Sequence, residues 1–150
     1  MQLPDLAFWL ERPNIVACEI AGLLGYRTVV LDMEHGAIGE DECDAIVALS
    51  RAIGLRCIVR VAAPSRILVQ QALDYGADAV MLPQLESLEH AREACGYAKF
   101  PPLGTRGVGY SRVTKYGAYT SIDDGFFAAQ NRETQCFAMI ETAPALRDCE

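Results

Sequence analysis

Short apolar runs alternate with longer segments of helical period along this chain, and this alternation restricts the fold more than any other feature. The apolar runs are rich in β-branched residues and predict strands at residues 6–10, 28–32, 56–61, 77–83 and 136–141. Helical segments between them end at Gly25, Gly54 and Gly76, each followed within a few residues by a strand. This repeated unit is typical of a parallel βαβ sheet, and the nearly continuous apolar runs indicate burial on both sheet faces.

The helices are expected at residues 14–24, 40–52, 65–75, 87–97 and 126–132, and from Pro144 onward. Ser65 and Ser87 stand where N-caps should be. Residues 100–119 are rich in Pro, Gly, Arg and Tyr and have no clear period. Within this long loop we expect one further, brief strand at residues 105–108.

Parallel units without a nucleotide-binding fingerprint leave two architectures, a doubly wound sheet and a barrel. Polar residues gather where the expected strands end, at residues 32–35, Arg60, Gln84 and Glu141. Both architectures bind ligands at that edge, so Arg60 and Gln84 are candidate substrate-binding residues. A closed barrel usually needs about 250 residues, so this chain, taken as a single α/β domain over residues 1–150, would form an incomplete barrel of about six βα units.

The net charge limits the partners that the chain can have. It carries 13 basic and 20 acidic residues, a formal charge of −7, so we expect neither nucleic-acid nor membrane binding. No apolar run approaches the roughly 20 residues needed to span a bilayer, and the N-terminus has no features of a secretory signal. The six cysteines are scattered without a C-x-x-C pair, which favours reduced thiols in a cytoplasmic protein.

His35 and Arg60 are the candidates for acid–base and anion chemistry, and each has two interpretations. An imidazole oriented by Asp32 would act as a general base near neutral pH, whereas the alternative is that His35 only caps a loop. The Arg60 guanidinium can bind a carboxylate in bidentate fashion and stabilise an enolate. Alternatively it forms a structural ion pair with Asp74 or with a helix carboxylate, and a pair with Asp74 would also hold Arg60 in place for either role.

Glu141 ends the last expected strand and is a carboxylate of the kind that Mg²⁺ and Mn²⁺ prefer. A single carboxylate is a weak signal for a metal site. Lysine chemistry is disfavoured, because a Schiff-base enzyme of this architecture needs its lysine inside the barrel and no clear strand ends in Lys99 or Lys115.

Residues 104–109 (G-T-R-G-V-G) form a glycine-rich segment. The segment has neither the G-x-G-x-x-G order nor a following helix, which argues against dinucleotide and P-loop binding. Two interpretations stay open: the loop binds an anion through its backbone N–H groups and Arg106, or it only positions Arg106 and Arg112.

Six segments of the chain resemble, in their order and approximate spacing, the HpcH/HpaI aldolase family, which includes 4-hydroxy-2-oxoheptanedioate and 2-dehydro-3-deoxyglucarate aldolases. The matching segments are V-L-D-M-E-H-G at 30–36, I-V-R-V at 58–61, A-L-D-Y-G-A at 72–77, V-M-L-P-Q at 80–84, F-P-P-L-G-T-R-G at 100–107 and I-E-T at 140–142. The resemblance covers nearly the whole chain and corresponds to the N-terminal part of such a protein.

The resemblance implies a (β/α)₈ TIM barrel and a class II aldolase that cleaves a 4-hydroxy-2-oxo acid to pyruvate and an aldehyde. It implies a divalent cofactor, Mg²⁺ or Mn²⁺ or a similar ion such as Co²⁺ or Zn²⁺, bound by Glu141. His35 with Asp32 would serve acid–base chemistry, and Arg60, supported by Asp74, would hold pyruvate and stabilise its enolate. A small 2-oxo acid as substrate and a homo-oligomer are further implications.

Two departures from the family pattern bear on these expectations. Met139 replaces a glutamine that many members carry two residues before the metal-binding glutamate, and the second metal carboxylate of the family has no counterpart before residue 150. Two alternatives therefore stay open. The same barrel would act as a decarboxylase or a carbon–carbon bond-forming enzyme on a 2-oxo acid, or the chain would be a non-catalytic fragment that needs the missing strands.

Overall fold

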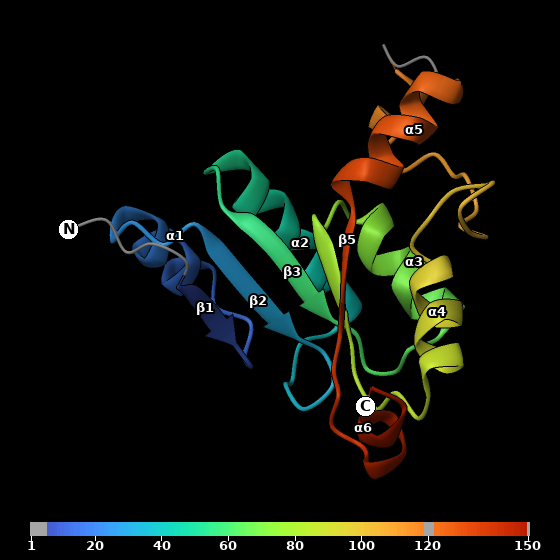
Figure 1. The fold of residues 1–150 in the computed structure, drawn as a ribbon. Coiled ribbons are helices and arrows are strands. Elements are labelled where there is room, and N and C mark those ends of the chain that lie inside the picture. The colour runs from blue at the N-terminus through green and yellow to red at the C-terminus, as the bar shows by residue number, and fades with distance from the viewer. Residues whose placement is uncertain (1–5, 119–121, 150) are drawn as a thin grey trace.

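The computed structural model describes residues 6–118 and 122–149, and its centre is a parallel sheet whose strands lie in chain order (Figure 1). The strands are β1 (Ala7–Leu10), β2 (Thr28–Asp32), β3 (Arg56–Arg60), β4 (Ala79–Leu82) and β5 (Gln135–Ala138). Every neighbouring pair is parallel. A doubly wound sheet would reverse its strand order at a switch point, so the uninterrupted order is that of a partial barrel, as predicted.

Helices connect the strands close to the positions that the sequence predicts. They are α1 (Ile15–Leu23), α2 (Glu40–Ala52), α3 (Arg66–Asp74), α4 (Leu88–Gly96), α5 (Asp124–Glu133) and α6 (Ala143–Asp148), with one 3₁₀ turn, η1 (Lys115–Gly117). The Ser65 and Ser87 hydroxyl groups accept hydrogen bonds from the first turns of α3 and α4, which confirms both predicted N-caps. Among the described helices, none is long and apolar enough to cross a membrane.

The two faces of the sheet bury different sets of side chains because successive residues of a strand point to opposite sides. One set packs with the helices in the main core and includes Val29, Leu31, Cys57, Val59, Val80 and Leu82. The other face carries a smaller cluster formed by Val30, Ile58 and Ala79, with Met81 packed against it. Asp32 and Arg60 continue this second face at the carboxyl ends of β2 and β3, in register with each other.

The strand predicted at residues 105–108 is absent, so the described residues contain five strands rather than the six expected. The loop is instead bound to α3 by side chains spaced four residues apart on one helix face, those of Arg66, Gln70 and Asp74. Arg66 donates to the Thr105 carbonyl oxygen at 2.9 Å, and Gln70 accepts from the Gly107 N–H at 3.2 Å. Backbone groups that would have joined a sheet are satisfied by these contacts.

The far edge of β5 has no neighbouring strand among the described residues, and α5 and α6 lie at opposite ends of this strand (Figure 1). Large apolar side chains are exposed on α1 and near the C-terminus: Ile15, Val16, Ile20, Leu23, Leu24, Ile140 and Leu146. Exposed apolar side chains that gather on one helix are expected where further chain or another molecule packs.

Candidate active site

The candidate site is centred on an ion pair between Asp32 and Arg60, which end neighbouring strands. Arg60 Nε donates to Asp32 Oδ1 at 2.9 Å, and Arg60 Nη2 donates to Oδ2, so the contact is bidentate. Both residues are buried. The Trp9 indole N–H donates to Asp32 Oδ2 at 3.4 Å, and the Arg60 guanidinium lies 5.0 Å from the centre of the Trp9 ring, within range of a cation–π contact.

This environment keeps Asp32 ionised. Burial alone would raise the pKa of Asp32, but hydrogen bonds from Arg60 and from the backbone N–H groups of His35 and Glu34 lower it from 3.8 to about 2. The same contact with Asp32 raises the pKa of Arg60. A carboxylate with so low a pKa is a poor proton acceptor at neutral pH, so Asp32 acts here as a fixed charge.

Asp32 contacts His35 through the backbone and not through the imidazole, which corrects the predicted contact. Asp32 Oδ1 accepts from the N–H of Glu34 at 3.0 Å and from that of His35 at 3.1 Å, closing a tight turn after β2. The His35 side chain is 69% exposed, and its Nε2 lies 3.7 Å from Glu34 Oε1. The turn therefore presents the imidazole to solvent at the carboxyl edge of the sheet.

Gly36 completes this turn because a side chain would not fit there. A Cβ atom at this position would lie 2.1 Å from the Asp32 carbonyl oxygen and 2.7 Å from that of Glu11. The neighbouring Ala37 N–H donates to the same Glu11 oxygen at 2.8 Å, which holds the turn against the segment after β1. The glycine of the D-M-E-H-G segment is thus explained by the close approach of two backbones.

Glu34 is a member of the cluster that sequence reasoning did not single out, although it stands within the same motif. Its side chain is only 5% exposed, and its Oε2 lies 3.2 Å from Arg60 Nη1. Its Oε1 accepts from Gln84 Nε2 at 2.8 Å. Trp9 was missed as well, and nothing in the sequence except its place near the end of a strand could have identified it.

Gln84 and Glu141 lie together at the same edge. The Gln84 N–H donates to Glu141 Oε1 at 2.6 Å, and both residues are solvent-exposed. Through Gln84 and Glu34, the structure thus connects Glu141 to Arg60 and Asp32. Of the predicted site residues, it brings together Asp32, His35, Arg60, Gln84 and Glu141.

Asp74 lies elsewhere, and its predicted ion pair with Arg60 is wrong. Because α3 connects the carboxyl end of β3 to the amino end of β4, Asp74 at the end of α3 lies near the amino edge of the sheet. It binds Arg106, with 3.0 Å between Oδ1 and Nη2. Burial lowers the pKa of Arg106, although Asp74 partly opposes this change.

The glycine-rich loop is held as a structural element. The Arg106 side chain is only 1% exposed and lies over the Phe100 ring, 4.6 Å from its centre. Arg112 binds Asp44 of α2, with 2.5 Å between Nη1 and Oδ1. Because both arginines are paired with carboxylates, the structure favours the second interpretation of this loop, in which it positions Arg106 and Arg112.

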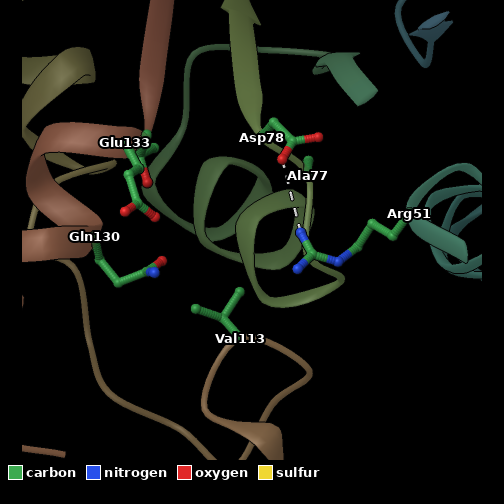
Figure 2. A pocket seen from close by; sticks show the side chains of 7 residues that line it. Arg51, Ala77, Asp78, Val113, Gln130 and Glu133 are labelled. Atoms are coloured by element: carbon green, nitrogen blue, oxygen red, sulfur yellow. Dashed lines mark ion pairs between the residues drawn. The ribbon is translucent and has the colours of Figure 1, made fainter. Parts of the chain in front are cut away.

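A pocket of about 160 Å³ lies at the opposite end of the sheet (Figure 2). Its lining includes Ala77 and Asp78, directly before β4, and Glu133 and Thr134, directly before β5. It is lined by Arg51, Ala77, Asp78, Val113, Gln130, Glu133 and Thr134. Arg51 and Asp78 form an ion pair at 3.7 Å within it. Lys99 also lies near this end and donates to the Asn131 and Thr134 carbonyl oxygens, so it does not face the candidate site.

The sequence profile described as HpcH/HpaI aldolase/citrate lyase matches residues 6–150. The chain belongs to this family. As a member of the HpcH/HpaI family, it carries its strand-end cluster at the edge where barrel enzymes bind their ligands.

Named relatives of the chain are aldolases. It is 35% identical to 2-dehydro-3,6-dideoxy-6-sulfogluconate aldolase of Pseudomonas putida, over 99% of this chain and 57% of the relative. It is 33% identical to 4-hydroxy-2-oxovalerate aldolase of Novosphingobium aromaticivorans, over 97% of this chain and 55% of the relative. The chain thus spans little more than half the length of these curated relatives.

Solved structures of family members have the same fold. An HpcH/HpaI aldolase from Desulfitobacterium hafniense superposes with a TM-score of 0.83 at 30% identity, over 95% of this chain and 55% of that one. A family protein from Burkholderia cenocepacia gives a TM-score of 0.84 at 27% identity, over 95% of this chain and 56% of that one. These matches support the assignment of the sheet as part of a barrel.

Proposed function

We propose that the protein is a metal-dependent class II aldolase that cleaves a small 4-hydroxy-2-oxo acid to pyruvate and an aldehyde. The observation that carries this proposal is the connected cluster of Asp32, Arg60, Glu34, Gln84 and Glu141, with the exposed His35 beside it, at the carboxyl edge of a barrel-type sheet. Family membership and the names of the relatives support it.

In this proposal Arg60 binds the 2-oxo acid and stabilises negative charge on it. The contacts with Asp32 and Glu34 fix the guanidinium in one orientation, so little reorganisation is needed when the enolate forms. Trp9 covers one side of the guanidinium and limits its access to water. The raised pKa of Arg60 keeps it charged at any working pH.

His35 is proposed as the proton-transfer group. Its imidazole would take the proton of the C4 hydroxyl group as the C3–C4 bond breaks, and the electron pair of that bond would pass into the pyruvate enolate. A proton returned to C3 of the enolate would then give pyruvate. Asp32 supports this role indirectly, because it anchors the backbone of the turn that presents His35.

The residues present fit a divalent ion only in part. Glu141 offers a hard carboxylate ligand, exposed at the site edge and held through one oxygen by the Gln84 N–H. Within residues 6–118 and 122–149, no group of three or more His, Cys, Asp or Glu side chains is placed to hold a metal ion. When bound, Mg²⁺, Mn²⁺ or a similar ion would supply Lewis-acid stabilisation of the charge on the 2-oxo group.

A homo-oligomeric assembly is part of the proposal. The apolar side chains exposed on α1 and the unpaired edge of β5 are surfaces that another molecule or further chain would cover. Size-exclusion chromatography with light scattering measures the assembly directly, and a stable monomer at micromolar concentration would contradict this part of the proposal.

The test measures pyruvate release from a 4-hydroxy-2-oxo acid, coupled to lactate dehydrogenase. We expect turnover that is abolished by EDTA and restored by Mg²⁺ or Mn²⁺. The H35N variant should lose most of this activity, whereas H90N, at the only other histidine, should retain it. Metal-independent turnover, or equal activity of the two variants, would overturn the proposal, and consumption of oxaloacetate alone would favour the decarboxylase alternative.

A further inference from the structure

Gln84 has a backbone conformation that is unusual for its residue type. It follows β4 and Pro83, and its φ of +51° lies in the left-handed region. A residue with a side chain is uncommon in that region and persists there only where the surrounding structure holds it. Gln84 thus carries local strain at the edge where the candidate site lies.

The strained backbone directs two donors of one residue to two carboxylates. The Gln84 N–H donates to Glu141 Oε1 at 2.6 Å, and its side-chain Nε2 donates to Glu34 Oε1 at 2.8 Å. Glu34 follows β2 and Glu141 follows β5, so Gln84, after β4, connects both ends of the site. The other oxygen of Glu34 contacts Arg60, which extends the connection to the Asp32 pair.

We propose that Gln84 is a positioning residue that fixes the orientation of Glu141 relative to Arg60, and that its left-handed backbone is the means by which it does so. This inference rests on the proposed function, in which Glu141 is a metal ligand. It adds to the substrate-binding role predicted for Gln84 from the sequence, because its backbone N–H and one N–H of its side-chain amide donate to protein carboxylates.

A matched pair of substitutions separates the backbone conformation from the side-chain amide. Gln84→Gly and Gln84→Val both remove the amide, but glycine adopts positive φ without strain and a β-branched residue strongly disfavours it. Gln84→Asn is the conservative variant, since asparagine tolerates positive φ and keeps an amide. Circular dichroism and thermal unfolding establish that each variant is folded before it is compared.

The first measurement is Mn²⁺ affinity, by electron paramagnetic resonance with the metal alone. We expect Q84G and Q84N to bind within about threefold of the wild-type protein and Q84V to bind at least about tenfold more weakly. Equal affinity of Q84G and Q84V would overturn the inference while leaving the metal site intact. If the wild-type protein binds no Mn²⁺, the proposed metal role of Glu141 fails, and the second measurement decides the inference.

The second measurement needs no metal. In a ¹H–¹⁵N correlation spectrum, the Gln84 backbone amide should shift strongly in E141A, because that variant lacks the carboxylate that accepts its hydrogen bond. The control is E86A, which removes an exposed carboxylate only two residues from Gln84. A Gln84 amide that responds no more to E141A than to E86A would overturn the inference, whatever the Mn²⁺ result.

Discussion

Arg60 and Asp32 face each other across neighbouring strands and share two hydrogen bonds, from Nε and Nη2 of the guanidinium to the two carboxylate oxygens. Asp32 also accepts from the backbone after β2, so one carboxylate fixes both the arginine and the His35 turn. A single change at Asp32 is therefore expected to affect stability and the geometry of the site together.

Replacing Asp32 by asparagine should destabilise the protein by about 3–5 kcal/mol, because it leaves the buried guanidinium without its main counter-charge. The free energy of unfolding from urea titration measures this loss. Glu19→Gln, at an exposed position of α1, is the control and should change stability by no more than about 0.5 kcal/mol. A loss of similar size in both variants would show that the ion pair contributes little.

Acid should remove the part of this stabilisation that depends on the ionisation of Asp32. The pKa of Asp32 is lowered from 3.8 to about 2, so its contribution is complete above the unfolded-state pKa and is lost as the pH falls through about 2. At about 1.4 kcal/mol per pKa unit, the shift corresponds to about 2 kcal/mol. Unfolding free energies at a series of pH values from about 5 down to about 2 should show this loss in the wild-type protein, and a smaller one in D32N.

Gly36→Ala should destabilise the protein by about 1–3 kcal/mol, since its methyl group would collide with the Asp32 and Glu11 carbonyl oxygens. Gly96→Ala makes the same chemical change at the end of α4, where nothing lies within 4 Å of the added atom. That control should be neutral or stabilising by up to about 1 kcal/mol, because alanine favours helix. Thermal unfolding of both variants gives the comparison, and destabilisation of equal size would contradict the explanation.

Asp74→Asn should destabilise the protein and loosen the loop around residue 106. Arg106 would remain buried without its counter-charge, at a cost of about 3–5 kcal/mol. Hydrogen exchange and limited proteolysis measure how far the loop loosens, and urea titration measures the free energy of unfolding. The D74N/R106M double variant should recover part of the lost stability, because methionine can pack on Phe100 without a charge. If no stability is recovered, the loss in D74N is not caused by the unpaired charge of Arg106.

Local features of the fold could be predicted from the sequence because they depend on neighbouring residues. The serine N-caps at Ser65 and Ser87 and the glycines after three helices are examples, and all three glycines, Gly25, Gly54 and Gly76, have positive φ. The apolar runs gave β2, β3 and β4 with ends accurate to two residues.

Features that depend on three-dimensional pairing could not be predicted in the same way. The partner of Arg60 follows from the register of β2 against β3, which places Asp32, and not Asp74, opposite it. The segment at residues 105–108 has residues that fit a strand, yet α3 side chains bind its backbone. The candidate site residues were predicted from their places at strand ends, but which of them contact one another depends on how the strands and loops pack in three dimensions.

The register of β2 and β3 also has a consequence for folding. If β3 paired one residue out of place, Arg60 would turn to the opposite face and enter the apolar core that Val59 occupies, and Asp32 would be buried without a cation. Burying either charged side chain without its partner would raise the free energy of the misaligned sheet. The neighbouring valines and isoleucine could take one another's places at much smaller cost, because all are apolar. The Asp32–Arg60 pair, which is proposed to serve the reaction, therefore also disfavours misaligned pairing of β2 with β3. A variant without this pair is expected to lose that preference for the native register.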